Sequence, residues 1–372
     1  MDNTTEVFDD WFFNSFKKYH KLQMFGVDKP VVSIELSSDS SVCLACEKPG
    51  GNCFEVLNLE LPSKLYQVEN QHDSINTCRD LKIRCGTLTE NRLIDMKTLF
   101  GKSKTILSEE GIGHVTMYEM APNKSDQMIP LVNIKSKIDS GRLAIDYSTD
   151  KLVIWGKEDS FNTGCMFDIE NNKRILSFCN KSNNPLDSYT PYFISKDELI
   201  VLNSENGSFD LYDIISGQHI KNIDLPVVDC NAKWFSNTVY TSSKETTTFN
   251  LTLISNCGVL LNYDLRNLKV PKIHQKELFS NCDNVINICF DPISPHRNAV
   301  SGFDGNVYII EEMDCSSNMS HIFKHEGHMF TEDEGLCQNN VTTSSLWLPM
   351  CGSNTLLSAA HDGSVQGWQY IS

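Results

Sequence analysis

Residues 355–370 read TLLSAAHDGSVQGWQY, and this stretch decides the fold class. Two runs of β-forming residues, Thr355–Ala360 and Val365–Tyr370, flank the turn His361-Asp362-Gly363. An Asp-Gly pair supplies the positive φ values that a tight hairpin turn needs. The stretch therefore predicts a β-hairpin whose second strand carries a tryptophan, Trp368, near its end.

Strands of the same kind, ending in an aromatic or aliphatic residue close to an acid, recur along the chain. The seven strands are Phe54–Glu60, His114–Met120, Cys165–Asp168, Phe209–Asp213, Val259–Asp264, Asn306–Glu311 and Val365–Tyr370. Their centres lie about 45 to 60 residues apart, which in a β-rich chain is the period of a propeller with one four-stranded blade per repeat. The sequence therefore predicts an all-β fold, a seven-bladed β-propeller.

The last repeat also contains the side chains of a buried hydrogen-bond network. Gly327-His328 precedes Trp368 by about forty residues, and the turn acid Asp362 lies between them, as in the WD-repeat signature. In that signature a histidine, a hydroxyl, an acid and an indole N–H bind one another. We assign these roles to His328, Ser358, Asp362 and Trp368. The alternative for His328 is a ligand or a catalytic base.

The other repeats are degenerate. The tryptophan is replaced by Phe167, Tyr212, Tyr263 or Ile310, and most repeats lack Gly-His. We therefore expect these blades to depend on apolar packing.

The last repeat ends directly after its third strand, so its outer strand must come from elsewhere or an edge stays open. The segment His20–Val27 precedes the first blade and is the predicted donor. This gives two parts: residues 1–28, an N-terminal helix plus the strand that closes the last blade, and residues 29–372, the seven-bladed propeller.

The residues before that strand predict a helix. Phe8, Trp11, Phe12, Ser15, Phe16 and Tyr19 fall on one stripe at helical spacing. Either the stripe packs on the rim of the propeller, or it binds a partner protein. For the second case the candidate interface residues are Trp11, Phe12, Phe16 and Tyr19.

Charge and composition narrow the classes of function. Lys and Arg number 32 and Asp and Glu number 48, so the net charge is −16. Such a surface repels phosphate backbones and anionic lipids. The acidic start MDNTTEVFDDWFF does not resemble a secretory signal, and no apolar run is long enough for a membrane span. We therefore expect no direct nucleic-acid partner, no membrane partner and reduced cysteines.

Two clusters could hold a metal ion. Cys43-x-x-Cys46, with Cys53 beyond, has no second Cys-x-x-Cys and falls on a predicted strand, so we interpret these thiols as small buried side chains. His321, His325 and His328 lie close together, but His328 is already assigned to the network. Neither a P-loop nor a Gly-x-Ser-x-Gly elbow occurs. We predict no catalytic residue, no cofactor and no metal.

The connection from His325 to Val341 is longer than a usual loop between strands, and long propeller loops often carry contacts. It forms the second candidate interface. Its residues are His325, Glu326, Met329, Phe330, Glu332, Asp333 and Glu334.

The chain resembles one family of WD-repeat propeller proteins over nearly its whole length. The resemblance begins with Asp9-Asp10-Trp11 and the helix around it. Further matching blocks are Leu57–Pro62, Arg79–Arg84, Asp95–Lys97, Ser301–Gly305, His325–Phe330, Val341–Thr343, Leu346-Trp347 and Leu356–Ala359. Between about residues 121 and 280 only the blade rhythm supports it. The last Trp-Asp of the family is Trp368-Gln369 here.

The resemblance implies a non-enzymatic cytoplasmic scaffold. The family is associated with assembly of the RNA endonuclease module of the Integrator complex, a heterodimer of catalytic and pseudo-catalytic metallo-β-lactamase subunits. A HEAT-repeat assembly factor, the BRCA1-associated ATM activator, is implied as a further partner. The family is also linked to microtubule organisation and to spindle poles in mitosis. We expect a monomer when no partner is bound.

Three other functions stay open at this point. Tyr263-Asp264-Leu265-Arg266 resembles the boxes of substrate receptors in cullin-type ubiquitin ligases. A microtubule-associated factor is a second alternative, although an acidic chain is poorly suited to bind acidic tubulin tails directly. An enzyme is the third, but the residues do not place a nucleophile against a base.

Overall fold

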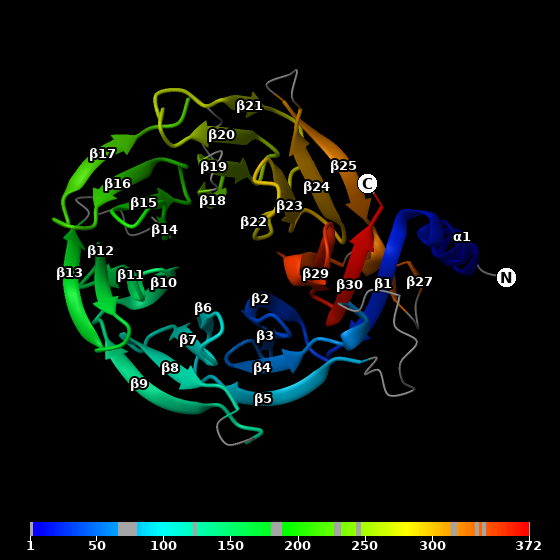
Figure 1. The fold of residues 1–372 in the computed structure, drawn as a ribbon, viewed down its shortest axis with the longest axis horizontal. Helices are drawn as coiled ribbons and strands as arrows, with labels where there is room; N and C mark the ends of the chain where they lie inside the picture. Colours follow the sequence, from blue (N-terminus) through cyan, green and yellow to red (C-terminus); the bar gives the residue numbers. More distant parts are fainter. Residues whose placement is uncertain are drawn as a thin grey trace.

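The computed structural model describes residues 3–65, 80–121, 125–179, 188–226, 232–242, 247–313, 318–331, 335–336 and 340–371. Its strands form seven four-stranded antiparallel sheets, which surround a central axis as blades (Figure 1). The predicted seven-bladed β-propeller with a short N-terminal helix is confirmed. Among the described helices none is both long and apolar enough to cross a bilayer.

Six blades are built from four consecutive strands each. Blade 1 holds β2 (Val31–Ser38), β3 (Ser41–Glu47), β4 (Phe54–Glu60) and β5 (Lys82–Leu88). Blade 2 holds β6 (Leu93–Leu99), β7 (Lys104–Glu109), β8 (His114–Glu119) and β9 (Ile129–Lys135). Blade 3 holds β10 (Asp139–Asp146), β11 (Lys151–Glu158), β12 (Phe161–Asp168) and β13 (Lys173–Cys179). Blade 4 holds β14 (Tyr189–Phe193), β15 (Glu198–Asn203), β16 (Phe209–Asp213) and β17 (His219–Ile223).

The remaining blades follow the same order, except the last. Blade 5 holds β18 (Trp234–Ser242), β19 (Thr247–Ser255), β20 (Leu260–Asp264) and β21 (Ile273–Gln275). Blade 6 holds β22 (Asn287–Phe290), β23 (Arg297–Ser301), β24 (Val307–Glu312) and β25 (Met319–His325). Blade 7 holds β28 (Thr342–Trp347), β29 (Thr355–Ala360), β30 (Ser364–Tyr370) and, as its outer strand, β1 (Tyr19–Gly26). The seven recurring strands of the sequence are the third strand of each blade.

Several further described elements lie outside the blades. These are the helix α1 (Asn3–Lys18), the short helices η1 (Ser63–Leu65), η3 (Gly327–Met329) and η4 (Pro349–Cys351), and a small hairpin of β26 (Phe330–Thr331) and β27 (Gly335–Leu336). Both η3 and the hairpin belong to the connection between blades 6 and 7. β27 of the hairpin lies beside α1 at the rim of the ring (Figure 1), and η3 contacts β30.

The hydrophobic core lies between the blades, because each sheet packs both its faces on its neighbours. In blade 7 the second strand, β29, is buried at all six residues. Leu357 and Val365 of blade 7 share one cluster with Leu44 of blade 1. Inner strands of neighbouring blades are also hydrogen bonded, for example through Thr343 Oγ1, which donates to the Val31 carbonyl at 2.6 Å. Because this bond joins blades 7 and 1, it helps to close the ring.

The ring closes where β1 pairs antiparallel with β30, from Tyr19 opposite Tyr370 to Gly26 opposite Ser364. This strand overlaps the predicted donor segment His20–Val27 in all but its last residue. The backbone continues the pairing at both ends, since the Ile371 N–H donates to the Lys18 carbonyl and the Val27 N–H donates to the Gly363 carbonyl, both at 2.9 Å. The N-terminal and C-terminal segments therefore form one sheet.

Gly363 shows why the hairpin turn needs glycine. Its φ is 88°, and a Cβ atom there would lie 2.5 Å from the Val27 carbonyl oxygen. Any other residue would push away the backbone that follows β1. The glycine of the turn from which the hairpin was predicted therefore also leaves room for the backbone that follows the closing strand.

Candidate protein-interaction surface

Blade 7 contains the predicted network together with Ser364, which the sequence analysis missed. The Trp368 indole N–H donates to Ser358 Oγ at 3.0 Å, and Ser358 Oγ lies 2.7 Å from His328 Nε2. On the other side of the ring, His328 Nδ1 lies 2.7 Å from Ser364 Oγ, which donates to the Asp362 carboxylate at 2.6 Å. Asp362 thus reaches the histidine through Ser364. The only sequence signal for this residue is its place directly after the turn glycine.

The directions of these bonds fix the protonation of His328. Ser358 Oγ accepts the indole N–H and donates its own hydrogen to Nε2, so Nδ1 carries the ring hydrogen and donates to Ser364. Burial lowers the pKa of His328 to about 4, although the Asp362 charge acts in the opposite direction. The ring is neutral at pH 7 and both its nitrogens are used. These contacts favour the network role assigned to His328 over the alternative of a ligand or a catalytic base.

His325 and Tyr19 are buried, which corrects their assignment to the candidate interface. The Tyr19 hydroxyl lies 2.8 Å from His325 Nδ1, and the His325 ring stacks on the Trp368 indole with a centroid distance of 4.4 Å. Burial lowers the pKa of His325 and raises that of Tyr19, so both are neutral at pH 7. Because Tyr19 is the first residue of β1, these contacts attach the closing strand to blades 6 and 7.

Trp11 must also be removed from the candidate interface. Its side chain is only 8% exposed, and Ser15, one turn later on α1, is only 6% exposed. α1 contacts β27 and β1, so this face of the helix packs on the rim of the propeller. An ion pair between Lys18 and Glu326, 3.3 Å long, joins the end of α1 to the connection before η3.

The opposite side of α1 faces solvent. Phe12 is 43% exposed, and Phe13 and Phe16 are each 67% exposed. We call these three residues the aromatic surface. The predicted stripe is therefore divided: Trp11 and Ser15 point to the propeller, while Phe12 and Phe16 point away from it. Sequence reasoning missed Phe13 because it falls outside the predicted stripe.

The structure brings the two candidate segments together at one place on the rim. Glu326 is half-buried and pairs with Lys324 at 3.2 Å as well as with Lys18. Met329 is half-buried in η3. Phe330 begins β26, and its side chain lies outside the described residues, as do Glu332, Asp333 and Glu334.

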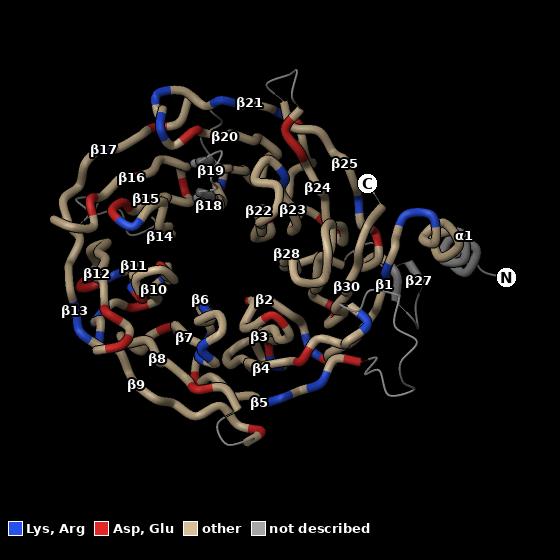
Figure 2. The backbone as a smooth tube through the Cα atoms, in the orientation of Figure 1, with Lys and Arg blue, Asp and Glu red and all other residues tan. Residues whose placement is uncertain are grey.

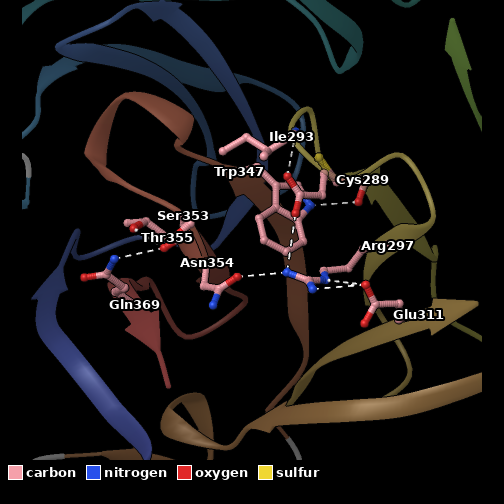
Figure 3. A network of polar contacts seen from close by, with 10 residues as sticks. Cys289, Ile293, Arg297, Glu311, Trp347, Ser353, Asn354, Thr355 and Gln369 are labelled. Atoms are coloured by element: carbon pink, nitrogen blue, oxygen red, sulfur yellow. Dashed lines mark hydrogen bonds and ion pairs between the residues drawn. The ribbon is translucent and has the colours of Figure 1, made fainter. Parts of the chain in front are cut away.

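The junction of blades 6 and 7 contains a second polar network, which the sequence did not indicate (Figure 3). Arg297 on β23 donates to Glu311 at 3.0 Å and, across the junction, to Asn354 Oδ1 at 2.8 Å. Nearby, the Trp347 indole N–H donates to the Cys289 carbonyl at 3.0 Å. The blade that receives β1 is therefore fixed to blade 6 by directional bonds near α1.

The candidate metal ligands are not brought together. Cys43 and Cys46 lie on one strand, three residues apart, and point to opposite faces of the sheet, where they join different core clusters. Burial raises the pKa of each thiol to about 12. His321 is exposed and lies 3.2 Å from the Leu278 carbonyl, whereas His325 and His328 are buried. Within the described ranges, His, Cys, Asp and Glu form no group of three that could hold a metal ion.

The box that suggested a ubiquitin-ligase receptor ends in an exposed turn of blade 5. Arg266 Nε donates to the Asp264 carboxylate at 2.8 Å, so the guanidinium is bound by its own turn. Asp264 in turn accepts the Arg266 backbone N–H at 3.0 Å. These contacts give Arg266 a local role at the strand end.

Comparison with known proteins identifies full-length relatives. The chain is 27% identical to a protein of Danio rerio named "Integrator complex assembly factor WDR73", covering 100% of this chain and 98% of that protein. It is 25% identical to the Xenopus laevis protein of the same name, with 96% of each covered. The Homo sapiens protein of that name is 22% identical, with 98% of this chain and 97% of the relative covered. No protein-family model matches the chain. The propeller fold, together with this similarity from end to end, makes the chain similar to the WDR73 proteins over its whole length.

Proposed function

We propose that this chain is a non-enzymatic scaffold that assists assembly of the Integrator complex. The observation that carries the proposal is the similarity over the whole chain to proteins that are themselves named Integrator complex assembly factors. A fold alone does not specify a function, so the propeller supports only the scaffold part. The proposal that this complex is Integrator rests on the names of the homologues.

The proposal extends to the RNA endonuclease module. We infer that the chain holds the heterodimer of catalytic and pseudo-catalytic metallo-β-lactamase subunits in the cytoplasm, together with the HEAT-repeat factor called BRCA1-associated ATM activator. The net charge of −16 favours contacts with protein subunits over contacts with RNA, because like charges repel. Assembly before nuclear import fits a chain that binds the enzyme and not its RNA substrate.

The buried titratable groups have structural roles, which supports a non-enzymatic function. General acid–base catalysis needs a group with a suitable pKa that the substrate can reach. His325 and His328 have perturbed pKa values, but both side chains are completely buried and bind neighbouring side chains. Their perturbation belongs to the packing of blade 7.

Affinity purification of the tagged full chain tests the proposal. Cytosolic and nuclear fractions are processed separately, and the captured proteins are quantified by mass spectrometry. We expect the endonuclease heterodimer and the HEAT-repeat factor in the cytosolic fraction. An Arg266→Ala variant is purified in parallel, because loss of a captured cullin adaptor in that variant would support the ubiquitin-ligase alternative. Absence of all Integrator subunits would contradict the proposal and leave the fold untouched.

A further inference from the structure

Exposed phenylalanines are concentrated on α1. Among the described side chains, the phenylalanines with the greatest exposure are Phe12, Phe13, Phe16, Phe100 and Phe161, and three of these belong to a little more than one turn of one helix. Their rings also contact one another, with centroids 5.1 Å apart for Phe12 and Phe16 and 6.0 Å apart for Phe12 and Phe13. Scattered apolar residues are normal on a surface, but a contiguous aromatic patch marks a binding site.

The helix that carries this patch is held in place by its other side. Trp11 and Ser15 are buried against the propeller, Lys18 pairs with Glu326, and Tyr19 is fixed by His325 immediately after the helix ends. The patch is therefore presented on a fixed element. Phe12 and Phe16 lie at positions i and i+4, the spacing of the apolar anchors with which a helix fills a groove on another protein.

The charges beside the patch select the kind of groove. Lys17, which follows Phe16 directly, is exposed, and Figure 2 shows basic residues where α1 passes into β1. A complementary partner surface is acidic at its border. Two copies of this chain, each with a net charge of −16, repel one another.

We propose that the aromatic surface of α1 docks into an apolar groove with acidic borders on a partner protein. The inference rests on the proposed function for the identity of that partner, which would be a subunit of the complex being assembled. The chemistry of the groove is inferred from the residues of α1 and is independent of the proposed function. Phe12 and Phe16 are the anchors, and the helix binds as a preformed unit.

Site-specific photo-cross-linking tests the inference in the full chain. Benzoylphenylalanine replaces Phe16 in one variant and Phe161 in the control, which is 54% exposed at the start of β12 on the far side of the ring. After irradiation in cells, cross-linked peptides are mapped by mass spectrometry. We expect position 16, and not position 161, to label a partner protein at an apolar surface bordered by Asp or Glu.

The outcomes separate the two proposals. Labelling of such a surface on an Integrator subunit supports both proposals, whereas labelling of such a surface on an unrelated protein supports the groove but gives no support to the proposed function. Labelling only of lipid or of a second copy of the chain, or labelling no stronger than at position 161, overturns the inference. Affinity purification of the unmodified chain then decides the proposed function by itself.

A substitution experiment measures the size of the effect. The double variant Phe12→Ser/Phe16→Ser should reduce capture of the cross-linked partner about tenfold or more, because buried aromatic anchors dominate binding energy. Phe161→Ser should leave capture unchanged. Both variants should melt at the temperature of the unmodified chain, since the replaced rings face solvent. Equal capture by the double variant and the unmodified chain would overturn the inference.

Discussion

Blades 4 and 7 have the same four-stranded shape but are held together differently. Blade 4 is made of consecutive strands, and Tyr212 occupies the place of the tryptophan, where it contacts the aromatic rings of Trp155 and Phe178 in blade 3 at 5.2 and 5.6 Å. Blade 7 joins strands from both ends of the chain and carries the complete network around His328. Its closing strand adds the contact between Tyr19 and His325.

The difference shows where directional bonds are needed. Dispersion and apolar burial in blade 4 are spread over many atoms, so the position of Tyr212 tolerates several residue types. Blade 7 must bring together segments that are far apart in sequence, at a greater cost in loop-closure entropy. A network in which each hydroxyl joins two partners and each nitrogen of the His328 ring has one selects a single arrangement of those segments.

Deletion of residues 1–26 should have the largest effect. It removes β1, leaves the edge of β30 unpaired and exposes the Trp368 layer, so the melting temperature should fall by about 10 °C or more. The matched control deletes residues 1–18, which removes α1 but keeps the closing strand. Differential scanning calorimetry should show a much smaller shift for the control. Equal shifts would mean that the helix, and not the strand, closes the ring.

Acidification should destabilise the network of blade 7. The pKa of His328 is about 4 in the folded chain and 6.5 ordinarily, so the unfolded chain binds the proton more tightly. The stabilisation is complete above pH 6.5 and is lost as the pH falls toward 4. Between pH 7 and pH 5 this one group should lower the free energy of unfolding by about 2 kcal/mol. His325, whose pKa is also lowered, acts in the same direction.

Urea unfolding at both pH values measures this effect. His328→Gln should be less stable than the unmodified chain at pH 7 but should lose less stability on acidification. If the stability of the variant depended on pH as strongly as that of the unmodified chain, protonation of His328 would not be the cause of the loss.

A pair of Trp→Phe variants separates polar from apolar stabilisation. Trp155 and Trp368 are both fully buried, but Trp155 Nε1 makes no hydrogen bond to the described residues, whereas Trp368 Nε1 donates to Ser358. Trp368→Phe should therefore destabilise by about 1 kcal/mol more than Trp155→Phe. Urea titrations of both variants at pH 7.5 provide the comparison. A larger loss for Trp155→Phe would show that packing dominates in both blades.

The smallest loss of stability is expected on breaking the exposed ion pair between the end of α1 and the connection before η3. Lys18 and Glu326 lie 3.3 Å apart, and their side chains are 46% and 31% exposed. Exposed pairs of this kind contribute about 0.5 kcal/mol or less. Lys18→Ala should therefore leave the urea midpoint nearly unchanged, as should Arg266→Ala on blade 5. A clear loss of stability for Lys18→Ala, with none for Arg266→Ala, would show that the ion pair helps to hold α1 in place.

The fold was predictable where local chemistry and period agree. Asp362-Gly363 specifies a turn by its own backbone preferences, and Trp368 occupies a position that recurs at the blade period as an aromatic or aliphatic residue, so both could be placed without tertiary information. Ser364 could not be found in this way, because it acts through a histidine that lies far before it in sequence.

The interface was predictable only in part, for a physical reason. Helical periodicity places Trp11 and Phe12 on one broad stripe, but it does not say which edge of the stripe meets the propeller. That choice depends on the contact of α1 with β27, which lies far away in sequence. His325 was assigned to the surface from its position in a long connection, although it ends β25 and points into the layer beside Trp368.

The pairing of β1 with β30 has a consequence for synthesis of the chain. Tyr19 is translated long before Tyr370, its strand partner. The six blades made of consecutive strands can form while the nascent chain grows, but blade 7 must wait until β30 has been synthesised, and until then β1 is an unpaired edge. A truncation that removes only β30 therefore leaves β1 without its partner strand, even when the other six blades are complete.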